Sequence, residues 1–188
     1  MTILFVVLGI IVLLVIVFIG IFNGLVRLRN EVKNSWAQID VQLKRRYDLI
    51  PNLVEAVKGY VKHERETLES VTKARNLAQQ LSTSENVGAR GKAEGELSSA
   101  LMRLLAVAES YPDLKANQNF LALQEELSST ENKISFSRQY YNDSVLKLNN
   151  QVQMFPSSVV ASMANFHAGE FFEVTVAAEK EAPKVKFS

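Results

Sequence analysis

Apolar side chains fill almost every position from Ile3 to Phe22, and the first charged residue of the chain is Arg27. Because a helix rises about 1.5 Å per residue, this run is long enough to cross the ~30 Å hydrocarbon core of a bilayer. A cleaved secretory signal is the competing interpretation, but it requires a basic start and small residues at a cleavage site, and neither is present. The pattern therefore predicts an uncleaved transmembrane anchor over residues 1–24.

Beyond the anchor, apolar residues recur every three or four positions, with one gap near Tyr47, which is typical of a helix with one buried face. No proline precedes Pro51, so we expect the anchor and the first helix to form one continuous rod. Proline disfavours helical geometry in the residue before it and is tolerated in a first turn. We therefore expect a break at Pro51 and a second helix from about Asn52 to about Leu81. The apolar face of the first helix comprises Leu25, Leu28, Val32, Trp36, Ile39, Leu43 and Ile50.

Two further helices are expected. A polar loop over residues 82–88 and the run Tyr111-Pro112-Asp113 bracket the third helix. The fourth carries a coiled-coil-like stripe of about five heptads that ends at Pro156, after which Ser157 can cap a short helix through about Ala164. The stripe consists of Phe120, Leu123, Leu127, Thr130, Ile134, Ser137, Tyr141, Val145, Leu148, Val152 and Phe155.

Four long helices with short connections predict an all-α fold, with an antiparallel four-helix bundle over residues 25–165 that continues from the anchor. Positions on the apolar faces of the first and fourth helices are expected to form its core. These core positions are Trp36, Ile39, Leu43, Leu127, Ile134 and Leu148.

The tail, residues 166–188, has a different pattern. Residues 171–176 alternate and are rich in aromatic and β-branched side chains, and residues 184–187 place two apolar side chains on one face, so both segments favour short extended strands. An isolated hairpin is marginally stable, so such strands need a partner surface. We expect the tail to pair with a neighbouring copy in a homo-oligomer; the alternative is a flexible tail lying on its own bundle. The expected contact residues are Phe171, Phe172, Val174, Val176, Val185 and Phe187.

Gly20 and Gly24 form a small-x-x-x-small pattern, which lets transmembrane helices approach closely and predicts association of anchors. A loose helix end near the membrane surface is the alternative. Basic residues follow the anchor, Arg27 and Arg29 first, and the positive-inside rule then places the bundle on the cytoplasmic side of the inner membrane. The extracytoplasmic side stays an alternative.

Composition and motifs exclude most chemistry. The net charge of +1 gives no field that attracts nucleic acid, and the absence of cysteine removes disulfides, thiolate metal sites and thiol nucleophiles. His63-Glu64 begins like a zinc-protease motif, but Thr67 stands where the second ligand belongs. Residues 88–92 resemble part of a phosphate loop but lack its other glycine and the hydroxyl residue, so a helix start is the better interpretation. We therefore expect no catalytic residue, no cofactor and no metal site.

The run Arg45-Arg46-Tyr47-Asp48 lies beside the expected turn at Pro51. Arg45, Arg46 and Asp48 are candidates to clamp that turn by ion pairs or to contact a partner.

Several long motifs resemble the LemA family: residues 34–54, 111–116, 124–127 with 130–132, 138–142 and 155–157, with a fitting end at 181–185. The resemblance implies an N-terminal anchor and an antiparallel helical bundle, and it implies no established activity. Some members are envelope proteins linked to a membrane protease, a relative occurs in magnetosome membranes, and members with a lipidated cysteine lie outside the cytoplasm.

Two functions are consistent with these patterns. The first is a non-catalytic scaffold or adaptor of the bacterial cell envelope, which acts through self-assembly and protein contacts, with a membrane protease or other envelope proteins as candidate partners. The alternative is a membrane-anchored bundle that senses a small ligand between its helices.

Overall fold

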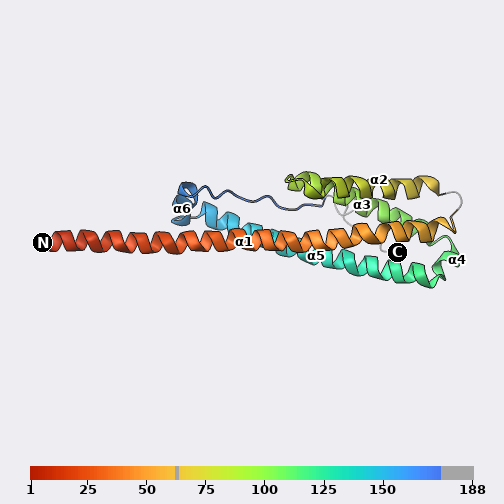
Figure 1. The fold of residues 1–188 in the computed structure, drawn as a ribbon, viewed down its shortest axis with the longest axis horizontal. Helices are drawn as coiled ribbons and strands as arrows, with labels where there is room; N and C mark the ends of the chain where they lie inside the picture. Colours follow the sequence, from red (N-terminus) through yellow and green to blue (C-terminus); the bar gives the residue numbers. More distant parts are fainter. Residues whose placement is uncertain (62–63, 175–188) are drawn as a thin grey trace, which may run out of the picture. The chain divides into compact units, whose positions relative to one another are not determined.

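The computed structural model describes residues 1–61 and 64–174, and all regular secondary structure within these ranges is helical. Two helices are much longer than the rest, α1 (Thr2–Lys58) and α5 (Gln118–Gln153), as Figure 1 shows. The others are α2 (Arg65–Gln80), η1 (Leu81–Thr83), α3 (Val87–Ala108), α4 (Pro112–Lys115) and α6 (Ser157–Met163). The predicted all-helical class and the predicted continuity of the anchor with the first helix are therefore confirmed.

The chain divides into two packing units. Unit 1 contains residues 1–38 of α1 with residues 139–170. Unit 2 contains residues 39–138 and the start of the tail at residues 171–174. These units are defined by packing and do not test the predicted limits of the anchor, bundle and tail. The boundaries after residues 24 and 165 therefore stay predictions.

Pro51 does not break the first helix: α1 continues past it, so the predicted break and the predicted second helix from Asn52 are wrong. Proline has no N–H to donate to the carbonyl of Tyr47, four residues earlier. Nε of Arg75, on α2, donates to that carbonyl at 3.2 Å. A side chain from another helix thus satisfies the acceptor that the proline leaves open, and the helix continues.

The third helix, α3, ends close to its predicted end, and a capping residue fixes its start. The side chain of Asn86 accepts a hydrogen bond from the N–H of Ala89 at 2.8 Å, which satisfies a donor of the first turn. The segment over residues 88–92 is therefore a helix start, as expected. The predicted short helix after Pro156 is confirmed as α6.

The core of unit 2 contains most of the predicted positions. Ile39, Leu43, Leu127 and Ile134 are buried there, and Tyr47 fills the gap in the apolar face of α1.

In unit 1, Leu148 and Leu25 are buried in a cluster with residues of α6. Trp36 is only half-buried, where its ring lies 4.9 Å from that of Tyr141. Phe155, the last residue of the predicted stripe, is 83% exposed, so its assignment to the buried face is wrong. The cause is that α5 ends at Gln153, before that residue.

The predicted strand over residues 171–176 is not formed in its described part, because residues 171–174 are not assigned to any strand. Phe172 is fully buried within unit 2. The tail passes so close to α3 that a Cβ on Gly91 would lie 2.2 Å from the carbonyl oxygen of Glu173. Glycine at position 91 makes this approach possible.

Candidate functional site

A buried ion network joins three helices of unit 2. The side chain of Arg46, on α1, is 1% exposed. Its Nη1 donates to both carboxylate oxygens of Glu131, on α5, at 2.8 and 3.1 Å, and to the hydroxyl of Ser98, on α3, at 3.0 Å. Its Nη2 forms an ion pair with Glu94, also on α3. One guanidinium thus neutralises two carboxylates and cross-links α1, α3 and α5, which is the geometry that arginine's planar fork allows.

Neighbouring groups extend the network. The hydroxyl of Tyr47 donates to the second carboxylate oxygen of Glu94, and Arg90 pairs with Asp40 between α3 and α1. Burial, together with the adjacent Glu94 carboxylate, raises the pKa of the Tyr47 phenol. Burial alone would lower the pKa of Arg46, but the carboxylates of Glu131 and Glu94 outweigh it, so the pKa is raised. The Arg46 charge is therefore permanent, and Tyr47 stays a donor.

The network forms the floor of a pocket of about 510 Å³ between α3 and α5, here called the α3–α5 groove. Apolar side chains of both helices line its walls. Polar residues of α5, together with Phe172 and Val174 from the start of the tail, complete the lining. The lining comprises Leu43, Arg46, Glu94, Ser98, Leu101, Met102, Leu105, Gln124, Leu127, Ser128, Glu131, Asn132, Ile134, Ser135, Arg138, Phe172 and Val174.

The acidic side chains of the network are already paired within the chain. Glu94 and Glu131 already accept from Arg46 and Tyr47, so neither is placed as a general base beside a nucleophile. Over residues 1–61 and 64–174, the structure contains no cluster of three or more His, Asp or Glu side chains that could hold a metal ion.

A sequence profile of the LemA family matches residues 35–187, a range that includes the whole network and the groove. The chain belongs to the LemA family. Protein LemA from Metamycoplasma hominis is 29% identical to this LemA-family chain over 166 residues, which cover 85% of the chain and 75% of that protein.

Magnetosome proteins are also similar to this chain. Magnetosome protein MamQ 2 from Paramagnetospirillum magneticum is 23% identical over 175 residues, and magnetosome protein MamQ from Magnetospirillum gryphiswaldense is 22% identical over 174 residues. The alignments cover 81% and 80% of this chain, and the chain spans 64% of the length of each MamQ protein.

The predicted turn clamp is corrected by the structure, because α1 has no turn at Pro51 for it to hold. Arg46 instead points into unit 2 and ties three helices together. Arg45 pairs with Glu126 at 2.5 Å on the surface, and Asp48 is exposed. Of the three candidates, only Arg46 lines the groove.

Sequence reasoning missed the partners of Arg46. Glu94 lies three residues before Leu97 and seven before Leu101, so it occupies a core-facing position of α3. Glu131 follows the buried Thr130 of the fourth-helix stripe. The sequence does carry a signal for this network. Glu94 and Glu131 lie in or beside apolar stripes, and Arg46 lies at the gap in the apolar stripe of the first helix.

The remaining candidate residues are placed differently. Apart from the backbone of α1 itself, no atom of the described residues lies within 4 Å of a Cβ built at Gly20 or at Gly24, so α1 is open at these positions. Anchor association stays a prediction. Phe172 and Val174 line the groove of their own chain, and Phe171 is 41% exposed. Their expected contact with a neighbouring copy stays a prediction. Three further tail candidates, Val176, Val185 and Phe187, lie outside the described residues.

Proposed function

We propose that this LemA-family protein is a non-catalytic, membrane-anchored adaptor of the cell envelope that binds a protein segment in the α3–α5 groove. The observation that carries the proposal is the groove itself. Its apolar walls are open to an incoming side chain, while the charges on its floor are already paired within the chain. Such a surface offers burial to a partner without requiring it to supply a counter-charge.

The anchor supports this function. The N-terminal part of α1 is long and apolar enough to cross a bilayer, and none of its most apolar window is buried within the chain. Exposed apolar side chains along Ile3–Ile19 have a suitable environment in lipid. The magnetosome relatives fit a protein that works at a membrane. The basic residues that follow the anchor favour the cytoplasmic side of the inner membrane.

A second copy of the chain is the proposed partner, which makes the adaptor a homo-oligomer. Phe172 and Val174 already line the groove of their own chain. The tail residues that remain as candidates to enter a neighbour's groove are Val176, Val185 and Phe187. The α3–α5 groove supplies the surface that an extended segment with alternating apolar side chains needs.

The mass of the detergent-solubilised full-length particle tests this proposal. Met102 lines the groove and is 50% exposed, so Met102→Lys places a charge in the binding surface without disturbing the core. Val41 is an exposed apolar residue of unit 2 that does not line the groove, so Val41→Lys is the matched control. We expect the wild type and Val41→Lys to share one multi-subunit mass and Met102→Lys to be smaller. A monomeric wild type, or an unchanged Met102→Lys particle, would contradict the proposal.

A ligand sensor is the second candidate, and the size of the groove favours it. A volume of about 510 Å³ falls within the range of small-molecule pockets, and Asn132 and Arg138 add polar groups to the lining. A thermal-shift screen of metabolites against the wild type and Met102→Lys separates the two functions. A compound that stabilises only the wild type favours the sensor.

A further inference from the structure

The link between α5 and α6, together with the outer face of α6, exposes apolar side chains that a water-facing surface rarely gathers. Met154 is 62% exposed, Phe155 83%, Val159 51% and Met163 72%. Val159 and Met163 are four residues apart and share one face of α6. The opposite face of α6 is buried against the chain. We call residues 154–163 the α5–α6 corner.

The stretch of sequence that contains the corner has no charge. Between Lys147 and Glu170 there is no Asp, Glu, Lys or Arg, whereas the rest of the chain beyond the anchor has charged residues at short intervals. Helices of soluble domains normally place charged residues on their outer faces. Here the exposed side chains of α6 are Val159, Met163 and the uncharged Ser162, so its outer face is suited to an environment less polar than water.

Packing within unit 1 places the corner at the level where the anchor ends. Val160, Ala161 and Phe166 form one cluster with Leu25 of α1, and Ile21 packs against it. At this level the apolar run of the anchor ends, and the first basic residues, Arg27 and Arg29, follow.

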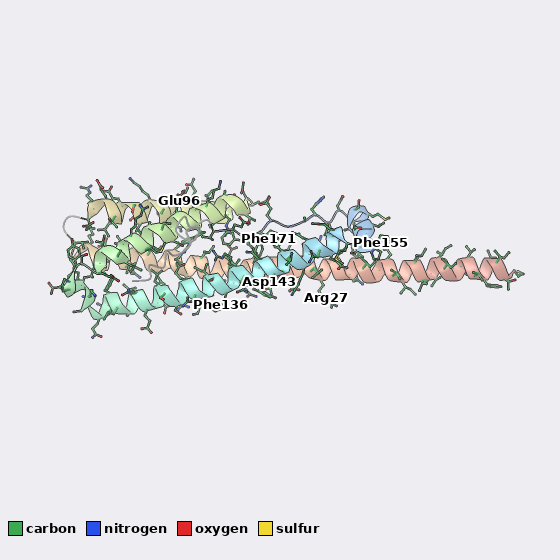
Figure 2. All side chains as sticks on the ribbon, turned by 180° about the vertical axis from the view of Figure 1, so that it is seen from behind. Arg27, Glu96, Phe136, Asp143, Phe155 and Phe171 are labelled. Carbon is green, nitrogen blue, oxygen red and sulfur yellow. The ribbon has the colours of Figure 1, made fainter. Side chains whose placement is uncertain are left out.

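Two ring contacts fix the same level. The rings of Phe22 and Phe166 meet edge to face at 5.9 Å, and the guanidinium of Arg29 lies 5.0 Å from the centre of the Phe166 ring. Figure 2 shows Phe155 beside the stretch of α1 that contains Arg27. The corner and the end of the anchor therefore lie side by side.

We propose that the α5–α6 corner is a second membrane contact, which inserts Met154, Phe155, Val159 and Met163 into the lipid surface beside the point where α1 leaves the bilayer. The proposal rests on α1 being the membrane span. Lipid is the occupant because the corner is continuous with the lipid-facing part of α1, carries no charge, and has Arg27 and Arg29 close by to meet headgroup phosphates. The corner then fixes the depth and direction of α1 as the helix leaves the membrane.

Depth-dependent fluorescence quenching tests this contact in the full-length protein. The chain has no cysteine, so single-cysteine variants take up one environment-sensitive fluorophore each. Phe155→Cys and Met163→Cys report on the corner; both side chains are exposed, so each variant is expected to fold. Leu146→Cys, on an exposed face of α5 in the same unit, is the matched control, and Leu13→Cys reports on the anchor.

Each labelled protein is reconstituted into phosphatidylcholine–phosphatidylglycerol vesicles, with lipids spin-labelled near the headgroup or deep in the acyl chain, and with iodide on both sides of the bilayer. We expect shallow spin labels, and not iodide, to quench both corner sites. Iodide alone should quench the Leu146 site, and deep spin labels should quench the Leu13 site.

Quenching of the corner sites by iodide to the same extent as the Leu146 site would overturn the proposal. Protection from iodide without quenching by spin-labelled lipid would also overturn it, because a protein contact would then cover the corner. If the Leu13 site also escapes lipid quenching, the anchor itself has failed; if only the corner sites escape it, the anchor stands and the second contact is refuted.

Discussion

Replacement of Arg46 by methionine removes a cation on α1 that pairs with carboxylates of both α3 and α5. Methionine keeps most of the side chain's length and apolar volume, so the main effect is electrostatic. Glu94, whose side chain is 3% exposed, is left as a buried carboxylate that still accepts a hydrogen bond from the Tyr47 hydroxyl. Glu131, at 36% exposed, can be hydrated.

The expected loss of unfolding free energy follows from the difference in exposure between Glu94 and Glu131. Removal of one partner of a buried ion pair costs about 3–5 kcal/mol, because the remaining charge stays desolvated. Since water reaches Glu131 and Tyr47 still donates to Glu94, we expect a loss near the lower end, about 3 kcal/mol of unfolding free energy. Arg46→Met combined with Glu94→Leu removes both buried charges and should recover at least half of the loss.

Arg45→Met is the matched control. Arg45 is adjacent in sequence and also paired, but its side chain is 50% exposed and that of Glu126 is 38% exposed. Water screens such a pair, so the expected cost is about 0–1 kcal/mol. Urea unfolding of the full-length protein in detergent, followed by far-ultraviolet circular dichroism, measures all three variants. If Arg46→Met costs no more than Arg45→Met, or if the double variant is less stable than the single one, the network does not tie the helices together.

Four further substitutions in unit 2, one of them a control, test three other predictions. Burial raises the pKa of Tyr47, so the native state keeps a proton that the unfolded state loses above about pH 10, and stability must fall as pH rises beyond that value. Tyr47→Phe should lose less stability than the wild type over that range in alkaline urea titrations, and an identical fall would contradict the assigned environment. Gly91→Ala should cost about 1–3 kcal/mol and speed proteolysis near Glu173, whereas Gly88→Ala, which meets only ordinary contacts, should do neither. Leu127→Ala should cost about 2–5 kcal/mol, and a loss below about 0.5 kcal/mol would show that its face is misassigned.

The helices and most of the core could be predicted from the sequence because they depend on local periodicity. Pro51 shows where that reasoning ends. Its local rules favour a break, but a hydrogen bond from Arg75, on another helix, satisfies the carbonyl that the proline leaves open. Such compensation depends on tertiary contacts, which single-sequence patterns do not contain.

The candidate site was predictable only in part. The run that contains Arg46 was selected as a candidate, but one of its two expected roles was to clamp a turn that α1 does not have. The partners Glu94 and Glu131 come from helices 48 and 85 residues away in sequence, so no local spacing connects them to Arg46. Phe155 failed for a different reason: the apolar periodicity continues past Gln153, where α5 ends, so the helix that would turn this side chain inward does not reach it.

Site-specific photo-crosslinking from the groove tests the adaptor function most directly. A photoreactive amino acid at position 102 in the groove, and one at Val41 as the control, are activated in native membranes. The account predicts a crosslinked product larger than one chain from position 102 only, with mass spectrometry locating the adduct in residues 175–188 of a second copy. Absence of any intermolecular product from position 102, or equal products from both positions, would contradict the claim that the groove binds a partner.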